Sequence, residues 1–226
     1  MLFISPVYLI MVALPSMLIA FWAQAKVKSA MAKYSRVANH AGLSGAEAAE
    51  HILRGSGVND VTITTTRGWM SDHYDPTKKE LRLSPDVHEG RSLAAVGIAA
   101  HEAGHALQQA HAYAPLMLRS AIVPMAAMSN LAWPILIAGI IFKLAALVNA
   151  AVILFLGLVV LQVINLPVEY NASRRARTAL LNFGIVSPDE DQGVKAVLNA
   201  AALTYVAAAL GAILQLLYFI GLARRN

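Results

Sequence analysis

Long apolar runs occupy most of the chain, and one extended polar stretch separates the first run from the others. Residues 1–23 are apolar throughout, and further apolar runs cover about 121–142, 145–166 and 194–223. About 20 apolar residues are enough for a helix to cross the roughly 30 Å hydrocarbon core of a bilayer. The pattern therefore predicts about four transmembrane helices, the middle two forming a hairpin around Lys143.

The first apolar run has two interpretations. Ala23-Gln24-Ala25 matches the small-residue pattern of a signal-peptide cleavage site. The run begins without the basic residues of a signal peptide, which favours a retained transmembrane anchor at 1–24. By the positive-inside rule, the basic residues that follow place this end in the cytoplasm. They are Lys26, Lys28, Lys33 and Arg36.

The last apolar run is less simple to orient. Alternation of the four predicted spans would place the C-terminus outside the cell, whereas Arg224 and Arg225 favour the cytoplasmic side. The run could instead lie along the membrane surface or enter it only in part. We expect a membrane helix here, and the sequence leaves open whether it spans the bilayer completely.

The polar stretch predicts a small α+β unit. Ser44–Glu47 has the capping-box pattern that opens a helix. Val58–Thr66 is rich in β-branched residues and Lys79–Ser84 alternates apolar and polar side chains, so both are predicted strands. Residues 92–112 are rich in alanine and leucine and predict a helix.

Composition agrees with a membrane location and excludes several function classes. The chain is 58% hydrophobic and 14% charged, whereas soluble domains carry about a quarter charged residues. It has no cysteine, which excludes disulfides, cysteine zinc ligands and thiol catalysis. The net charge is +5, but the basic residues lie mostly beside the apolar runs, where they contact lipid head groups. We therefore expect the lipid bilayer as a partner and no nucleic acid.

The strongest chemical signal is His101-Glu102-Ala103-Gly104-His105 within the predicted helix at 92–112. An i, i+4 spacing places both imidazoles on one helix face, about one turn apart, where they can bind one Zn²⁺ ion. Glu102 lies beside them, where it can act as general base and acid for a metal-activated water. The alternative is two histidines on a solvated face. Because the neighbours are mostly alanine, glycine and leucine, such a polar cluster would be costly without a ligand.

A catalytic zinc site needs a third protein ligand and one open position. His111 follows His105 by six residues, which is the metzincin spacing, but Gln108 stands where that motif requires a glycine. If the helix continues, six residues carry His111 away from the face of the other two histidines. His111 is therefore a poor third ligand.

Glu169 is the better candidate for a topological reason. The hairpin at 121–166 leaves the side of the membrane that holds the zinc helix and returns to it. Glu169 is the first carboxylate after that return, so it is predicted to lie level with the histidines. The alternative is an interfacial glutamate paired with Arg174 or Arg175.

Three stretches resemble the YugP-like membrane zinc metallopeptidases, and more loosely the HtpX-type and CaaX prenyl proteases. They are DHYDPTKKELRLSPDV at 72–87, HEAGHALQ at 101–108 and PVEYNASRRA at 167–176. The resemblance covers nearly the whole chain. It implies zinc on His101, His105 and Glu169 with Glu102 as base, in a cytoplasm-facing, gluzincin-like site of the bacterial inner membrane.

Two further residues are candidates near the site. In the HtpX-type enzymes an aspartate four residues after the glutamate orients a ligand histidine, and here that position is Ser173. A hydroxyl can still accept from an imidazole N–H, but it raises ligand basicity less than a carboxylate does. His73 could donate to the oxyanion of the tetrahedral intermediate, or it could be a turn histidine held by Asp72 and Asp75.

The sequence thus predicts a mainly α membrane protein with a small α+β, zincin-like catalytic part on the cytoplasmic side. Its expected activity is metal-assisted hydrolysis of peptide or protein substrates, membrane proteins among them, with Lys79–Ser84 as a strand edge for the substrate. The predicted parts are an anchor at 1–24, an α+β catalytic part at 25–120, a transmembrane hairpin at 121–166, a third-ligand helix and loop at 167–193, and a C-terminal membrane helix at 194–226.

Two alternatives to this activity stay open, as does oligomerisation. One is a non-catalytic membrane protein with a structural zinc site, although such a site gains nothing from a base at Glu102. The other is a site-2-type intramembrane protease, in which the zinc motif lies inside a span. The apolar run before His101 is only Leu93–Ala100, too short to span.

Overall fold

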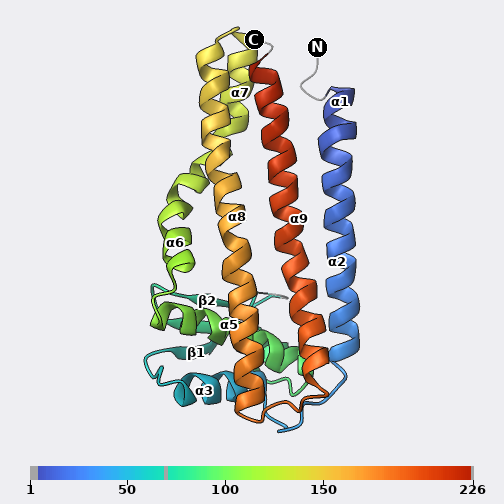
Figure 1. Cartoon of the computed structure of the whole chain (residues 1–226), viewed down its shortest axis with the longest axis vertical. Coiled ribbons are helices and arrows are strands. Elements are labelled where there is room, and N and C mark those ends of the chain that lie inside the picture. The colour runs from blue at the N-terminus through green and yellow to red at the C-terminus, as the bar shows by residue number, and fades with distance from the viewer. Residues whose placement is uncertain (1–4, 69–70, 225–226) are drawn as a thin grey trace. The chain divides into compact units, whose positions relative to one another are not determined.

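The computed structural model describes residues 5–68 and 71–224, so residues 1–4 of the predicted anchor and 225–226 of the last segment lie outside the described part. The chain folds into two compact units (Figure 1). We call residues 1–24, 117–167 and 203–226 the membrane unit, and residues 25–116 and 168–202 the α+β unit. Helices α2, α8 and α9 contribute residues to both.

Within the described residues, four helical segments are long and apolar enough to cross a membrane. The first consists of α1 (Pro6–Tyr8), the π-helical η1 (Leu9–Ala13) and α2 (Leu14–Tyr34). The second consists of α6 (Ala114–Ala127), the 3₁₀ turn η2 (Met128–Leu131) and α7 (Ala132–Ile141). The third and fourth are α8 (Ala145–Asn182) and α9 (Asp191–Ala223). This confirms the predicted mainly α membrane fold.

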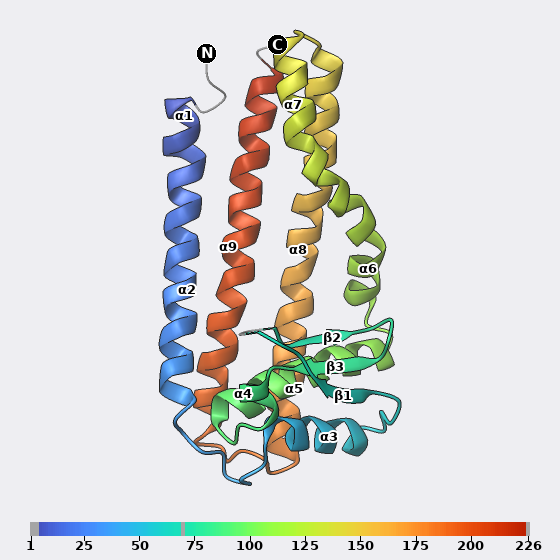
Figure 2. The same ribbon diagram turned by 180° about the vertical axis from the view of Figure 1, so that it is seen from behind.

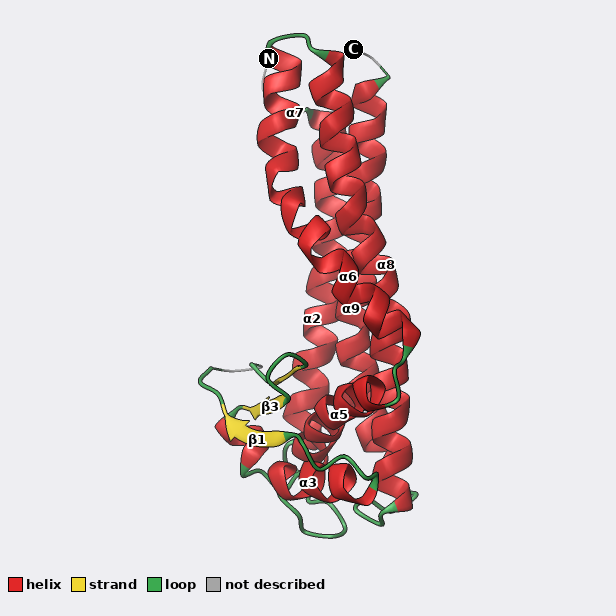
Figure 3. Cartoon of the chain, turned by 90° about the vertical axis from the view of Figure 1, so that its left-hand side faces the viewer, coloured by secondary structure: helices red, strands yellow, loops and turns green. Residues whose placement is uncertain are grey.

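The second of these segments is bent, as Figure 3 shows between α6 and α7. Pro124 lies inside α6 and removes a backbone donor, and the 3₁₀ turn η2 follows it. The hairpin that follows is tight. Gly139 of α7 lies so close to α8 that an added Cβ would meet the backbone nitrogen of Val148 at 2.8 Å.

Aromatic side chains fill the core of the membrane unit. Phe219 of α9 is fully buried, and its ring centroid lies 5.1 Å from those of both Trp133 and Phe155. The pair with Trp133 is edge-to-face and the pair with Phe155 is tilted, and such aromatic pairs add to the stabilisation from burial. The core therefore ties α7, α8 and α9 together.

The α+β unit contains a small sheet packed on helices. Its elements are α3 (Gly45–Gly55), β1 (Thr62–Thr65), β2 (His73–Asp75), β3 (Glu80–Leu83), α4 (Pro85–His88) and α5 (Leu93–Ala110). The capping box at Ser44 is confirmed, because its hydroxyl accepts from Glu47 N and the Glu47 carboxylate accepts from Ser44 N. Figure 2 shows α3, α4 and α5 beside the sheet, and in the described residues strands occur only in this unit.

The strand order is β1-β3-β2, with β1 parallel and β2 antiparallel to β3. The predicted strands at Val58–Thr66 and Lys79–Ser84 contain β1 and β3, whereas β2 was not predicted. The expectation that Lys79–Ser84 offers a free edge to a substrate is wrong. Because β3 pairs on both sides, the edge strands are β1 and β2.

Helix α5 is the centre of the core of the α+β unit. Most of the buried residues of α5 are small. Fully buried apolar side chains pack around the helix, among them Ile52 of α3, Leu81 and Leu83 of β3, and Leu180 of α8. The closest approach is between Gly104 and α8. A Cβ at Gly104 would lie 2.6 Å from the carbonyl oxygen of Ala172. No residue larger than glycine fits there without moving a backbone.

We expect Gly104→Ala to destabilise the protein by about 1–3 kcal/mol, because the added methyl group overpacks the contact between α5 and α8. Thermal unfolding of the detergent-purified protein measures the effect. Gly97→Ala on the same helix is the matched control, since its Cβ would meet only a side-chain methyl of Val194, at 3.3 Å. Equal unfolding temperatures for the two variants would contradict this account of the contact.

Candidate metal site

Helix α5 presents the two histidines of the motif on one face. The helix runs without interruption from Leu93 to Ala110, and the hydroxyl of its N-cap Ser92 accepts from Ala95 N. The ring centroids of His101 and His105 lie 4.8 Å apart with the ring planes at 84°. The i, i+4 spacing has therefore placed both imidazoles where they can share one ion.

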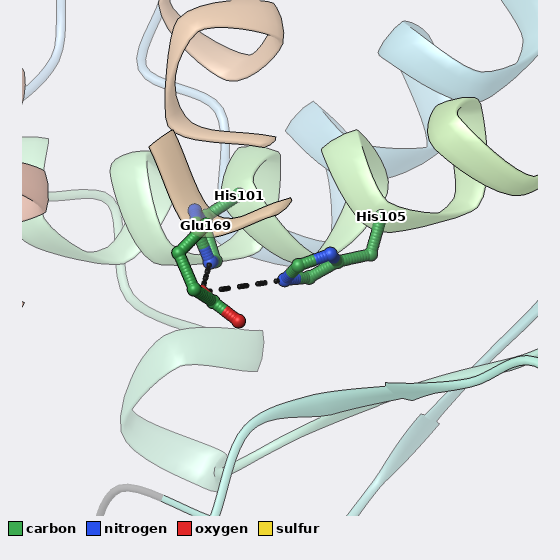
Figure 4. A group of neighbouring side chains, drawn as sticks. All are labelled: His101, His105 and Glu169. Atoms are coloured by element: carbon green, nitrogen blue, oxygen red, sulfur yellow. Dashed lines mark hydrogen bonds and ion pairs between the residues drawn. The ribbon is translucent and has the colours of Figure 1, made fainter. Parts of the chain in front are cut away.

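Helix α8 brings Glu169 to the same place, as Figure 4 shows. Its Oε2 lies 3.1 Å from Nε2 of His101 and 3.6 Å from Nε2 of His105. Glu169 is 2% exposed. The potential ligand atoms of the three residues all lie within 4.8 Å of one another, and no other such group of His, Asp or Glu occurs among the described residues.

These distances fit a zinc ion. In a tetrahedral site with ligand bonds of about 2.1 Å, neighbouring ligand atoms are roughly 3.4 Å apart. The two separations from Glu169 Oε2, 3.1 and 3.6 Å, lie on either side of that value. Imidazole nitrogens and a carboxylate oxygen are also the donors that zinc accepts in hydrolytic sites. The donor set and its spacing therefore suit Zn²⁺.

Both histidines are oriented through their other ring nitrogen. Nδ1 of His101 lies 3.1 Å from Oγ of Ser173, and Nδ1 of His105 lies 3.0 Å from Oε1 of Gln108. When Nε2 binds a metal, Nδ1 carries the proton and donates to these oxygens. Ser173 thus stands where the sequence predicted a partner for a ligand histidine.

Gln108 does more than accept from His105. Its side chain is fully buried, and its Nε2 donates to the carbonyl oxygen of Val168 at 2.7 Å and to Oδ1 of Asn171 at 3.0 Å. Oδ1 of Asn171 also accepts from Nε of Arg175, at 2.8 Å. Gln108 therefore links His105 of α5 to the backbone that precedes Glu169.

Sequence reasoning missed this role of Gln108, which entered only as the residue that breaks the metzincin pattern. A signal was present, because Gln108 follows His105 by three residues and so lies beside it on the helix surface. Its partners on α8 could not be seen from the sequence.

Glu102 lies next to His101 on α5 and is 9% exposed. Among the described residues, its carboxylate has no hydrogen-bond or ion-pair partner. Its charge still acts on the site. Burial disfavours the charged form of His105, but the hydrogen bond to Glu169 and the charges of Glu102 and Glu169 hold its pKa above the ordinary value. The local field therefore favours a cation.

His111 and the arginines lie outside the cluster. His111 caps the C-terminus of α5, and its Nδ1 lies 3.1 Å from Nη1 of Arg175. Arg175 also packs over the ring of Tyr113, with its guanidinium carbon 5.9 Å from the ring centroid. The recorded partners of Glu169 are the two histidines, not an arginine.

His73 is exposed in β2, and its Nδ1 lies 2.7 Å from the carbonyl oxygen of Ser71. The neighbouring aspartates have other partners. Asp72 accepts from the backbone N–H and hydroxyl of Ser84, and Asp75 accepts from two backbone N–H groups of the following turn. A role for His73 at an oxyanion stays a prediction.

Comparison with known proteins supports the same chemistry. Residues 8–224 match the family described as "Putative neutral zinc metallopeptidase". The chain is also similar to the "Putative membrane protease YugP" of Bacillus subtilis (strain 168), with 45% identity over 203 residues, which is 89% of this chain and 90% of that protein. No solved structure matches the chain.

Replacing Gln108 by leucine should lower zinc affinity by roughly 10–100-fold, because His105 loses the acceptor that orients its ring. Zinc affinity is measured by competition with a chelator of known affinity. Gln109→Leu is the matched control. Gln109 is adjacent on α5 but bonds Tyr74 and the carbonyl oxygen of Pro76 instead of a ligand. If both variants bind zinc equally well, Gln108 does not orient the site.

Proposed function

This chain belongs to the neutral zinc metallopeptidase family, and from that premise we propose that it hydrolyses peptide bonds with Glu102 as general base. The observation that carries the proposal is the carboxylate of Glu102. It is buried beside the paired histidines and has no recorded protein partner within residues 5–68 and 71–224. A carboxylate beside the histidines that forms no recorded hydrogen bond or ion pair is available for proton transfer.

In this proposal His101 and His105 hold zinc through Nε2, and Glu169 holds it through Oε2. Three protein ligands leave one position of a tetrahedral site open for water or substrate. When bound, zinc lowers the pKa of a coordinated water and polarises the scissile carbonyl. Ser173 and Gln108 keep the imidazole rings in the binding orientation through Nδ1.

Glu102 carries the proton in both steps. Its carboxylate oxygen accepts a proton from the attacking water, whose oxygen forms the new bond to the carbonyl carbon. The C–N bond then breaks, and Glu102 passes the proton to the leaving nitrogen. Water is consumed, and an amine and a carboxylic acid are formed.

We further propose that the site faces the cytoplasm of a bacterial cell and acts on peptides or membrane proteins. Lys26, Lys28 and Lys33 belong to the same compact unit as the site, and basic residues flanking a span mark its cytoplasmic side. The similar protein of Bacillus subtilis is described as a membrane protease. Four described helical segments are long and apolar enough to cross a lipid bilayer, which supports a membrane location.

The structure weakens both competing functions. A site-2-type protease carries its motif inside a span, but α5 is not among the described helices that are long and apolar enough to cross a membrane. A purely structural zinc site gives no reason to keep an unpaired carboxylate beside the histidines, since such a site transfers no proton.

We expect Glu102→Gln to reduce cleavage of an unfolded protein such as casein by about 10²–10⁴-fold while zinc content is unchanged. The enzyme is purified in detergent, and zinc is measured by mass spectrometry. The matched control is Glu50→Gln, an exposed carboxylate of α3 that pairs only with Arg54. Chelator-sensitive cleavage at the wild-type rate by Glu102→Gln would show that another group moves the proton.

A further inference from the structure

The membrane unit contains a cavity of about 460 Å³ that is open at the surface and is lined by the first apolar segment, α7, α8 and α9. Its lining reaches from Tyr8 to Gln24 along the first segment, and Figures 1 and 2 both show that segment beside α9. Sixteen residues of helix rise about 24 Å, so the cavity is long and narrow. None of the described residues that line it is charged.

The facing surfaces of α2 and α9 are built from small residues, among them Ser16 and Ala20 on α2 and Ala207 and Gly211 on α9. Small residues normally let two membrane helices pack closely. At Gly211 a Cβ would lie 3.5 Å from Oγ of Ser16, and because glycine has no Cβ, space remains at this position of the cavity. Small side chains therefore line this open space, which we call the channel.

Two buried polar atoms at this channel have no hydrogen-bond partner. They are Oγ of Ser16 and Nε2 of Gln215. Gln215 is 9% exposed, and its Oε1 is already used, because it accepts from the hydroxyl of Tyr8 at 2.9 Å. An unsatisfied donor inside a bilayer is unfavourable, since lipid tails offer no acceptor. Gln215 Nε2 can only donate, so the missing partner is an acceptor such as a carbonyl oxygen.

The size of the channel decides what can fill it. An α-helix is about 10–12 Å wide, so 24 Å of helix would need roughly 1,900 Å³. Non-bonded carbon atoms approach to about 4 Å, so a single hydrocarbon chain about 4–5 Å wide and 24 Å long needs roughly 300–480 Å³. The cavity volume of about 460 Å³ fits the hydrocarbon chain and is far smaller than that of a transmembrane helix of this length.

We propose that this channel binds one acyl chain of a membrane lipid, whose ester carbonyl accepts a hydrogen bond from Nε2 of Gln215. Ser16 offers a second donor nearby, because it lies against Gly211, one helical turn from Gln215. The chain extends from there between the small residues of α2 and α9. The absence of charge from the described lining residues suits this neutral part of the lipid.

Trp133 lines the channel and provides a direct signal. The other two tryptophans of the sequence, Trp22 and Trp69, are replaced by phenylalanine. The protein is then titrated in a steroid-based detergent with a monoacylglycerol that carries bromine on its acyl chain. We expect saturable quenching of Trp133 fluorescence at low probe concentration, since bromine quenches only at close range.

Two substitutions on one helix separate channel binding from contact with the outer surface. Gly211→Leu fills the channel and should weaken binding at least tenfold, whereas Gly221→Leu, which meets nothing within 4 Å, should leave it unchanged. Gln215→Leu should weaken binding of the monoacylglycerol about threefold to tenfold, the loss of one hydrogen bond. The same substitution should not affect binding of a brominated alkane of equal length.

Quenching that rises linearly without saturation would overturn the proposal, as would equal binding by Gly211→Leu and Gly221→Leu. If the alkane binds as tightly as the monoacylglycerol to the parent protein, the carbonyl is not recognised and the assignment to a lipid ester is wrong. Because the readout needs neither zinc nor proteolysis, its result is independent of the function proposed above.

Discussion

The contact between α5 and α8 at Gly104 is the constraint on which the site depends. Because Gly104 has no side chain, the carbonyl oxygen of Ala172 can lie close to the backbone of α5. A Cβ at Gly104 would be only 2.6 Å from that oxygen. Glu169 and Ser173 flank Ala172 on α8, and His101 and His105 flank Gly104 on α5. One backbone contact therefore sets the spacing of all three potential ligands and of the partner of His101.

The polar groups around this contact form a connected set with little tolerance for rearrangement. Each histidine uses one ring nitrogen toward Glu169 and the other toward an oxygen of the protein. Gln108 adds the backbone of Val168 to that set. Within the described residues Glu102 stands apart from it, since its carboxylate is bonded to none of them. Three potential metal ligands beside a carboxylate without a recorded partner are consistent with the proposed metal-assisted hydrolysis.

Much of the architecture could be read from the sequence because its signals are local. The apolar runs predicted the long helices, the Ser44–Glu47 pattern predicted the start of α3, and alanine-rich residues 92–112 contained α5. Strand β2 was missed because three residues give no alternation to detect. The central place of β3 was missed because pairing partners are not encoded in a strand's own pattern.

For the site, the sequence supplied the histidines from their spacing and Glu169 from topology, and the structure brings these residues together. The hydrogen bond from Gln108 to the carbonyl oxygen of Val168 could not be predicted from the sequence, because it depends on how closely α8 packs on α5. Nor could the sequence show the channel beside Gln215, because small residues on two helices usually indicate close packing.

X-ray absorption at the zinc edge of the purified protein tests the central claim most directly. The account predicts one zinc ion per chain with two imidazole nitrogens at about 2.0–2.1 Å, a carboxylate oxygen at about 2.0–2.2 Å and one further oxygen ligand. A shell with three imidazoles, or less than one bound zinc ion per chain after loading, would contradict the assignment of His101, His105 and Glu169 as the metal site.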